Sequence, residues 1–274
     1  MTPALRNPAR PIVLKYISLF WAFFRASLSA DVEYRINFGM RILTDILYYV
    51  SQIAIFEVLF RQTNSLGGWS VEHARVFLGI LFVVDATWMI LFSENLDRFS
   101  DKVRRGDLDL LLAKPVDSQF IMSLQKTATA FIANWFIAFS FLVWSLYTFP
   151  GEIRLAGLAL LLLLMPCGVL VMYTNRFMFS VTALIFTRAE NLQYLWYQIH
   201  KLGTRPDTMY PLWLRYLVLS VLPLAFIASV PARVVFDGGG LRLVFGTLVM
   251  TTLCLCLTKL VWKFALKHYS SASS

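Results

Sequence analysis

The chain has 274 residues, 58% of them hydrophobic and 15% charged, and its formal net charge is +9. Long apolar runs such as 155–173 can cross a hydrocarbon core about 30 Å thick at a rise of about 1.5 Å per residue. The sequence therefore excludes a soluble protein and predicts an all-α polytopic membrane protein. Lys and Arg gather at the ends of these runs, a positive-inside pattern that argues against a nucleic-acid partner.

Residues 12–34 are predicted to form an amphipathic helix at the membrane surface. Apolar side chains recur there at helical spacing, whereas Lys15, Ser18 and Arg25 fall elsewhere. The alternative is a first spanning helix that continues to Leu28. Signal-peptide cleavage is not expected, because Lys15 interrupts the apolar core. The apolar positions are Tyr16, Leu19, Phe20, Phe23 and Phe24.

Five apolar stretches farther along the chain predict membrane spans. They cover 38–60, 75–92, 123–149, 155–186 and 241–262, the last after a flexible turn at 237–240. The fourth stretch is too long for one ordinary span. Pro166 is expected to kink it, and Asn175 with Arg176 marks either its emergence from the hydrocarbon or a break into two pieces.

The region 187–236 leaves one further crossing open. The stretch 188–206 is polar for a span, and 212–235 is apolar but interrupted by Pro223 and Pro231. With about six spans and both chain ends on one side, only one of the two stretches crosses. If the first crosses, the second is a re-entrant segment, which is tolerated only where its irregular backbone is buried in protein or lines a cavity.

The distribution of cations predicts that residues 94–118 face the cytoplasm. This segment carries five Lys or Arg residues, whereas the turns at 61–70 and 149–154 carry one each. Cytoplasmic loops are enriched in such cations. Both termini are then expected to be cytoplasmic, and the chain after 262 is itself basic.

The 94–118 segment is predicted to contain two short helices bent at Gly106. Asp107 is expected to cap the second helix, and Lys114 with Pro115 to end it. One interpretation is a loop that lies against the membrane; the other is a docking element that offers an apolar ridge with flanking charges to a soluble partner. The apolar positions are Leu96, Phe99 and Val103 in the first helix and Leu108, Leu111 and Leu112 in the second.

Six ionisable residues lie within or beside the predicted spans, where charges are costly. They are Arg41, Asp45, Glu57, Asp85, Glu94 and Arg176. Arg41 and Asp45 are spaced to pair on one helix face. Asp85, near the middle of the second span, is the candidate pathway residue.

Motifs for catalysis are absent from the sequence. It contains no G-x-x-x-x-G-K-[ST] phosphate loop, no H-E-x-x-H and no G-x-S-x-G. The three Cys and three His residues fit no metal-ligand spacing. The chain is therefore not expected to be an enzyme or to carry a metal or cofactor of its own.

Three stretches occur in an order that resembles the six-span permease subunits of type-2 ABC transporters, the ABC-2 family. They read LDRFSDKVRRGDLDLLLAKPVDSQF, LGTRPDTMYPLWLRYLVLSVLPLAFIASVPA and the C-terminal ALKHYSSASS, and the similarity covers nearly the whole chain. The resemblance implies one transmembrane domain over 1–274, in the bacterial cytoplasmic (inner) membrane. It also implies pairing with a second copy or a related permease, membrane lipids around the pair, two cytoplasmic ATPase subunits that bind ATP and Mg, and transport that is usually outward.

In that family the loop between the second and third spans carries a coupling helix that docks on the ATPase. The resemblance further implies that 12–34 is the interfacial connecting helix, 188–206 the fifth span and 207–236 a re-entrant extracellular segment. By position, the coupling residues would be Arg104, Arg105, Gly106, Asp107, Leu108, Asp109, Leu112, Lys114 and Pro115.

Two other classes of function remain as alternatives. The intramembrane acids Asp45 and Asp85 suggest a membrane-embedded enzyme that acts on lipid substrates. A scaffold subunit without a transport pathway is the third hypothesis.

Overall fold

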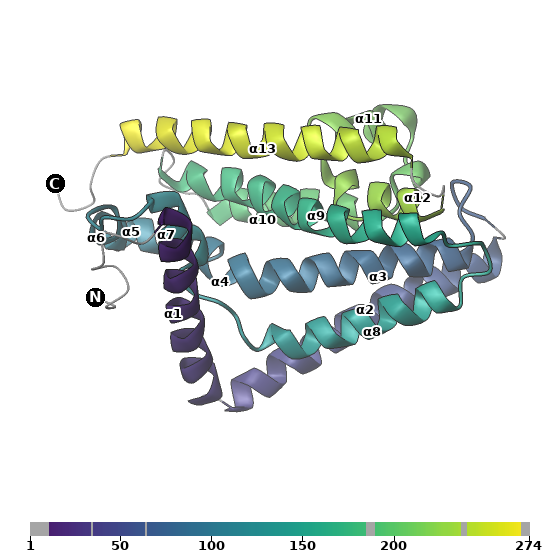
Figure 1. Ribbon diagram of the computed structural model, residues 1–274, viewed down its shortest axis with the longest axis horizontal. Coiled ribbons are helices and arrows are strands. Elements are labelled where there is room, and N and C mark those ends of the chain that lie inside the picture. Colours follow the sequence, from purple (N-terminus) through teal and green to yellow (C-terminus); the bar gives the residue numbers. More distant parts are fainter. Residues whose placement is uncertain (1–10, 34, 64, 185–189, 237–239, 270–274) are drawn as a thin grey trace.

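The computed structural model describes residues 11–33, 35–63, 65–184, 190–236 and 240–269. Within these residues every regular element is a helix, apart from an isolated bridge between Leu66 and Trp69 (Figure 1). The predicted all-α class is therefore confirmed. Residues 188–189, most of the turn predicted at 237–240 and the tail after Tyr269 lie outside the described residues.

Long helices make up most of the bundle. They are α1 (Ile12–Glu33), α2 (Arg35–Gln62), α3 (Val71–Trp88), α8 (Phe131–Tyr147), α9 (Leu155–Val181) and α13 (Leu241–His268). Figure 1 shows α3, α9 and α13 running nearly parallel, with α2 and α8 inclined beside them. Among the described residues, five helical runs are long and apolar enough to cross a bilayer: Ile12–Asp31, Gly39–Gln62, Val71–Arg104, Leu155–Leu184 and Leu241–His268.

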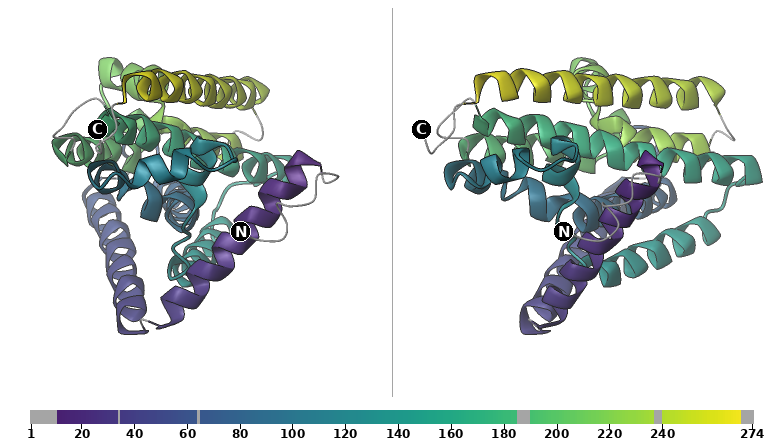
Figure 2. Two further views of the ribbon diagram at one scale, coloured as in Figure 1. Left: turned by 90° about the vertical axis from the view of Figure 1, so that its left-hand side faces the viewer. Right: turned by 60° about the vertical axis from the view of Figure 1, so that its left-hand side comes forward.

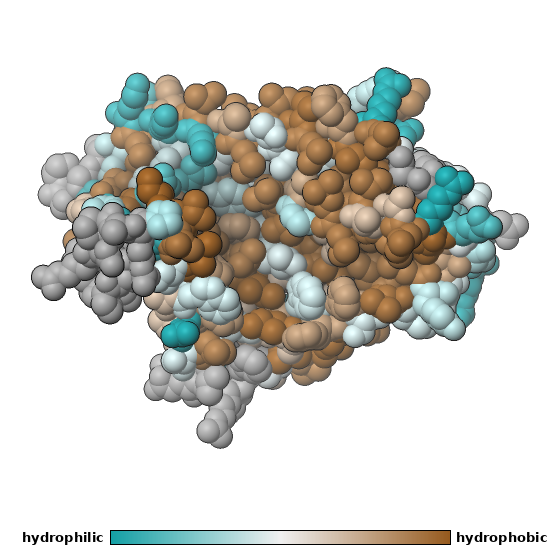
Figure 3. All heavy atoms as spheres, in the orientation of Figure 1, coloured by the Kyte–Doolittle hydropathy of each residue, from teal (hydrophilic) through white to brown (hydrophobic). Residues whose placement is uncertain are grey.

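The surface of the bundle fits a lipid environment. Large apolar side chains such as Phe136, Leu162 and Leu253 are 61%, 69% and 58% exposed. Figure 3 shows hydrophobic side chains over the middle of one face and hydrophilic ones toward its two ends. Such an apolar belt between polar ends is what a bilayer requires. The protein is therefore a multi-pass membrane protein.

Helix α1 is long enough to span a membrane, but it does not run with the spans. Figures 1 and 2 show it crossing the direction of α3, α9 and α13 at a steep angle. Near its C-terminal end, Asp31 Oδ2 accepts hydrogen bonds from the backbone N–H and hydroxyl of Thr129, at 2.9 and 2.6 Å. The Ser27 hydroxyl accepts one from the Thr127 N–H at 3.1 Å. This orientation agrees with a helix at the membrane surface.

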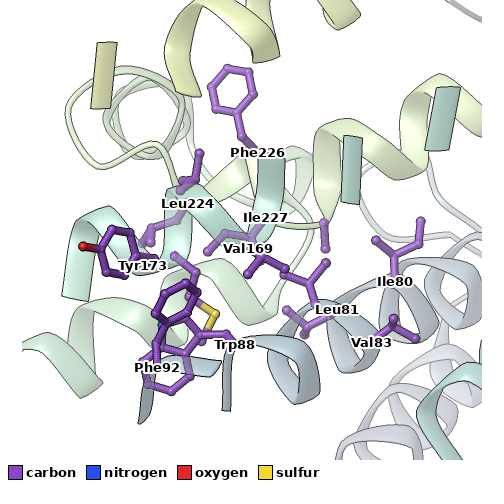
Figure 4. Close-up of a cluster of buried hydrophobic side chains, with 14 of the residues drawn as sticks. Ile80, Leu81, Val83, Trp88, Phe92, Val169, Tyr173, Leu224, Phe226 and Ile227 are labelled. Carbon is purple, nitrogen blue, oxygen red and sulfur yellow. The ribbon is translucent and has the colours of Figure 1, made fainter. Parts of the chain in front are cut away.

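Close packing around α3 forms the core. At Gly79, an added Cβ would lie 2.8 Å from Leu142 Cα, so the glycine allows α8 to approach α3. At Gly168, an added Cβ would lie 2.7 Å from the Ile227 carbonyl oxygen, so α9 meets the segment around Ile227 in the same way. Figure 4 shows the apolar side chains of α3, α9 and this segment gathered in one cluster.

The third predicted span, 123–149, is wrong at its start. The short helix α7 (Ser118–Leu124) ends there, residues 125–130 are not helical, and α8 begins at Phe131. The physical reason is Asn95, whose side-chain amide donates to the carbonyl oxygens of Ser123 and Lys126 at 3.0 and 2.6 Å. In a continuing helix, the Ser123 carbonyl would accept a hydrogen bond from a backbone N–H of the next turn. Here it accepts from the Asn95 side chain instead, and the helix ends.

The fourth predicted span, 155–186, is one continuous helix over most of its length. α9 passes through Pro166, Asn175 and Arg176 without interruption, so the alternative of a break is wrong. Neither polar residue emerges from the bundle, because Asn175 is 4% and Arg176 0% exposed. Asn175 instead donates to the Val171 carbonyl one turn earlier, at 2.9 Å.

Among the described residues, neither stretch that was a candidate for the remaining crossing forms a helix long enough to span a membrane. α10 (Glu190–His200) has 11 residues, about 16 Å of helix, and is too short to cross alone. The 3-10 helix η4 (Lys201–Thr204) follows and lies against Leu224, because a Cβ on Gly203 would be 3.3 Å from the Leu224 Cβ. Figure 1 shows α10 in one half of the bundle and α11 (Leu212–Ser220) with α12 (Ser229–Phe236) in the other.

A buried carboxylate holds this irregular region together. Asp207, in the 3-10 helix η5 (Asp207–Met209), is 1% exposed. Its Oδ2 accepts from Arg215 Nε at 2.9 Å and pairs with an Arg233 nitrogen at 3.2 Å, and its Oδ1 accepts from the Ser229 hydroxyl. Buried charges are stable when paired and hydrogen-bonded in this way. Asp207 therefore connects η5 to both α11 and α12.

The Asp207→Asn substitution tests this role. It keeps the size of the side chain but leaves Arg215 and Arg233 without their carboxylate, so we expect the free energy of unfolding in detergent to fall by about 3 kcal/mol. Glu152→Gln, at an exposed position on the same side of the bundle, is the matched control and should cause no change. Equal unfolding midpoints for the two variants would contradict the role given to Asp207.

Candidate functional site

The 94–118 segment forms two short helices at the end of the bundle away from α11 and α12 (Figure 1). They are α5 (Phe99–Arg104) and α6 (Asp107–Leu112), which follow α4 (Glu94–Leu96). Gly106 joins α5 and α6 in the left-handed region, with φ of 74°, which a glycine adopts without steric cost. The predicted bend at Gly106 is confirmed.

Asp107 has a different role from the predicted one. The N-cap of α6 is Gly106, and no side chain caps this helix. Asp107 is the first helical residue, where its carboxylate is favourable to the positive end of the helix dipole. The prediction of a side-chain cap was wrong because the left-handed glycine already fixes the turn.

One face of the segment is buried in the protein. Leu96, Phe99 and Leu108 are each fully buried, and they belong to the main hydrophobic core. α5 packs against α9 and against the 3-10 helix η3 (Thr182–Leu184) at its end. A soluble partner therefore cannot reach the Leu108 side chain, although Leu108 is among the residues that the resemblance assigns to coupling.

The opposite face of α6 is free. Leu110 is 71% exposed, and Arg105, Asp107 and Lys114 around it are also exposed. The sequence contained a signal for this residue, because Leu110 is the leucine of DLDLLL that falls off the face shared by the other three. The structure thus buries Leu108 and Leu111, leaves Leu112 partly buried, and exposes Leu110, which was not among the predicted apolar positions.

The remaining coupling candidates lie on or near this exposed side. Arg104 forms a surface ion pair with Asp101, three residues earlier, and both side chains are largely exposed. Such surface pairs are worth about 1 kcal/mol or less. Pro115 is exposed as well, whereas Asp109 and Leu112 are partly buried.

Asn95 connects the start of the segment to the chain that follows its end. In addition to the two hydrogen bonds that it donates, its Oδ1 accepts from the Lys126 N–H at 3.0 Å. Asn95 is 0% exposed. These hydrogen bonds hold the start of the segment against the chain after it, and so restrict movement of the segment relative to the bundle.

Arg176 connects the segment to α9 and α10. Its guanidinium donates to Asp97 Oδ1 at 2.7 and 3.2 Å, and it lies over the rings of Trp196 and Tyr197 at 4.9 and 5.6 Å. The Tyr197 hydroxyl also donates to Asp97 Oδ1, at 3.3 Å. One turn farther along α9, the Ser180 hydroxyl donates to the Leu96 carbonyl at 3.2 Å. The sequence identified Arg176 as an ionisable residue within or beside a span but gave neither its burial nor its partner, because Asp97 is 79 residues away.

Helix α1 is attached to the far end of the segment. The Tyr16 hydroxyl accepts from the Asp117 N–H at 3.1 Å, and the Tyr16 ring meets the Phe120 ring edge-on at 4.8 Å. Asp117 in turn caps α7, because its Oδ1 accepts from the Phe120 N–H at 2.8 Å. The surface helix and the segment therefore form one connected unit.

The charges within the spans find partners on other helices. Arg41 pairs with Glu94 at 3.7 Å and not with Asp45, and Asp45 accepts from the Asn134 side chain at 2.6 Å. The expected Arg41 to Asp45 pair therefore does not form, because Glu94, the first residue of α4, lies closer to the guanidinium. Glu57 accepts from Arg75 at 2.6 Å.

Asp85 is partly exposed on α3. In the part of the chain that the structure describes, Asp85 makes no hydrogen bond or ion pair. No group of three or more His, Cys, Asp or Glu residues among the described residues is placed to hold a metal ion.

Comparisons with known proteins complete the description. A protein-family model described as ABC-2 family transporter protein matches residues 46–273. Neither a search of curated proteins nor a search of solved structures gave a match. The matched region runs from α2 to the end of the chain and contains the 94–118 segment. The chain therefore belongs to the ABC-2 family of transporter proteins and is a permease subunit of an ABC transporter.

Proposed function

We propose that this permease forms the membrane pathway of an ATP-driven exporter and receives its driving force through α6. Two cytoplasmic ATPase subunits bind ATP and Mg, and the permease pairs with a second copy or a related permease. The complex lies in the bacterial cytoplasmic membrane with both chain termini in the cytoplasm. The observation that carries the proposal is Leu110, an exposed apolar side chain on a helix that is otherwise anchored in the core.

The chemistry of the α6 surface supports docking on a soluble protein. Arg105, Asp107 and Lys114, which lie within five residues of Leu110 in the sequence, are also exposed, and interfaces commonly combine an apolar centre with a charged rim. The cation content of the 94–118 segment supports a cytoplasmic location. Because the sequence has no phosphate loop, an ATPase must come from another chain.

The contacts at the base of the segment offer a route for transmitting force. A partner that moves α6 also moves Leu108 and therefore the core around it. The Asp97 to Arg176 contact then acts on α9 and α10. Packed elements of this kind move as units because interiors are close-packed.

Asp85 is the proposed pathway residue. Asp85 is partly exposed in a span and has no partner among the described residues. An ionisable residue in such a position lowers stability, so its presence points to a functional role. The same two acids, Asp45 and Asp85, had suggested a lipid enzyme, but family membership favours transport.

The Leu110→Asp substitution tests docking. We expect affinity for the partner ATPase to fall about tenfold, because an aspartate cannot fill an apolar pocket. The unfolding temperature of the permease should stay unchanged, since Leu110 is 71% exposed. Affinity is measured by co-purification and by titration of the ATPase onto the permease in nanodiscs.

Leu108→Ala is the contrasting variant for the same experiment. It leaves a cavity under α6, so the free energy of unfolding should fall by about 3 kcal/mol, while affinity measured at low temperature should remain. Normal ATPase binding by the Leu110→Asp protein would refute docking through α6.

The Asp97→Asn substitution tests transmission. The buried Arg176 charge loses its carboxylate, so we expect the permease to lose about 3 kcal/mol of stability. The ATPase should still bind, because the α6 surface is unchanged, but its stimulation by the permease should be lost.

Arg98→Gln is the matched control for this variant. Arg98 pairs with Glu94 at 2.9 Å, but its side chain is 56% exposed, so its removal should have little effect. If Asp97→Asn retains full stimulation of the ATPase, force does not pass through Arg176.

A further inference from the structure

Two cavities adjoin on one side of the bundle. The first, here the basic cavity, has a volume of about 680 Å³ and lies between α1, α7, α9 and α13. The second, here the apolar cavity, has about 490 Å³ and lies between α3, α8 and α9. Phe92 and Leu170 line both, so the cavities share a wall. Each volume is within the range of ligand-binding pockets.

The basic cavity carries two lysines. Lys259 and Lys263 are four residues apart on α13 and therefore lie on one face of the helix. Both are exposed, and neither pairs with a carboxylate of the described residues. Asp117 also lines the cavity, but its carboxylate caps α7. The cavity therefore offers positive charge to an anion.

Aromatic and hydroxyl groups complete the wall beside the lysines. The Tyr173 hydroxyl accepts from Gln119 Nε2 at 3.0 Å and hydrogen-bonds the Ser123 hydroxyl at 2.8 Å. The Trp262 indole donates to the Ser118 hydroxyl at 3.1 Å. Figure 4 shows the Tyr173 hydroxyl pointing away from the apolar cluster, with Phe92 and Val169 on its other side. This wall is where the lining changes from polar to apolar.

The described residues that line the apolar cavity leave no side-chain polar group without a hydrogen-bond partner. Thr87 and Trp135 are the residues there with polar side-chain atoms. The Trp135 indole donates to the Thr87 hydroxyl at 3.0 Å, and that hydroxyl donates to the Val83 carbonyl at 2.7 Å. With both groups satisfied, the cavity favours hydrocarbon over water.

The two cavities lie at the depths that the headgroup and the acyl chain of a lipid occupy in a bilayer. Lys263 is five residues from the end of α13, about 7 Å along the helix axis, at the end where α5 and α6 lie (Figure 1). Lysines in such positions reach headgroup level. Pro166, in the wall of the apolar cavity, lies near the middle of α9 and so at hydrocarbon depth.

We propose that the two cavities form one binding site for an anionic phospholipid of the leaflet that contacts α5 and α6. Its phosphate lies between Lys259 and Lys263, and one acyl chain passes Phe92 and Leu170 into the apolar cavity. Positive charge at the mouth selects an anionic headgroup over a zwitterionic one. The site belongs to the permease itself and does not depend on an ATPase or on transport.

Native mass spectrometry of the full-length permease in detergent tests the headgroup contact. Phosphatidylglycerol should be retained about tenfold more than phosphatidylcholine of the same chain length, and the Lys259→Gln/Lys263→Gln variant should lose this preference. Lys267→Gln removes a charge one turn farther along α13, outside the cavity lining, and should keep it. Equal retention of the two lipids, or no effect of the double variant, would overturn the proposal.

A pair of neighbouring leucines tests the acyl-chain contact. Leu162 lines the apolar cavity and is 69% exposed, whereas Leu163 is 49% exposed and does not line it. Leu162→Trp narrows the cavity without burying the new side chain in the core, so phosphatidylglycerol retention should fall severalfold; Leu163→Trp should leave it unchanged. If both behave alike, or if millimolar glycerol phosphate displaces the lipid completely, the acyl chain does not occupy the cavity and the proposal fails.

Discussion

The buried charge of Arg176 is the constraint on which the half of the structure that holds α5 and α6 depends. A guanidinium that is 0% exposed within a span needs a carboxylate, and Asp97 supplies it at 2.7 Å. The rings of Trp196 and Tyr197 cover the same group. One side chain therefore fixes α9, α10 and the start of the 94–118 segment relative to one another. Displacing the segment must either move these helices or expose the charge.

In the opposite half of the bundle, a second buried charge is likewise neutralised by residues of opposite charge. Asp207 is buried in irregular backbone, and Arg215 and Arg233 neutralise it from two short helices. Irregular chain at membrane depth is stable only when surrounding protein satisfies its polar groups. The Arg176 to Asp97 pair and the Asp207 cluster each involve a residue in a turn or a short 3-10 helix. Each therefore connects an irregular segment to the neighbouring helices.

One face of α6 packs in the core, and the other face is exposed. Leu108 is fully buried and anchors the helix in the core, whereas Leu110, two residues later, is 71% exposed. The role proposed for α6 needs both features, since the helix would have to be held in the core on one side and bind a partner on the other. Asn95 and Tyr16 reinforce the first requirement by fixing the base and the far end of the segment.

The sequence alone determined the membrane class, most of the long spans and the two short helices bent at Gly106, because hydropathy and local turn chemistry act over a few residues. The family followed from the resemblance of longer stretches and from the family model that matches residues 46–273. The sequence failed where distant residues compete for the same backbone or charge. Asn95 ends a helix at Leu124, and Glu94 takes Arg41 from Asp45. The resemblance also put Leu108 among the coupling residues by position, and periodicity could not correct this, since it defines a helix face but not what covers it. Only the tertiary structure decided that Leu108 faces the core and Leu110 the solvent, because burial depends on which other helices pack nearby.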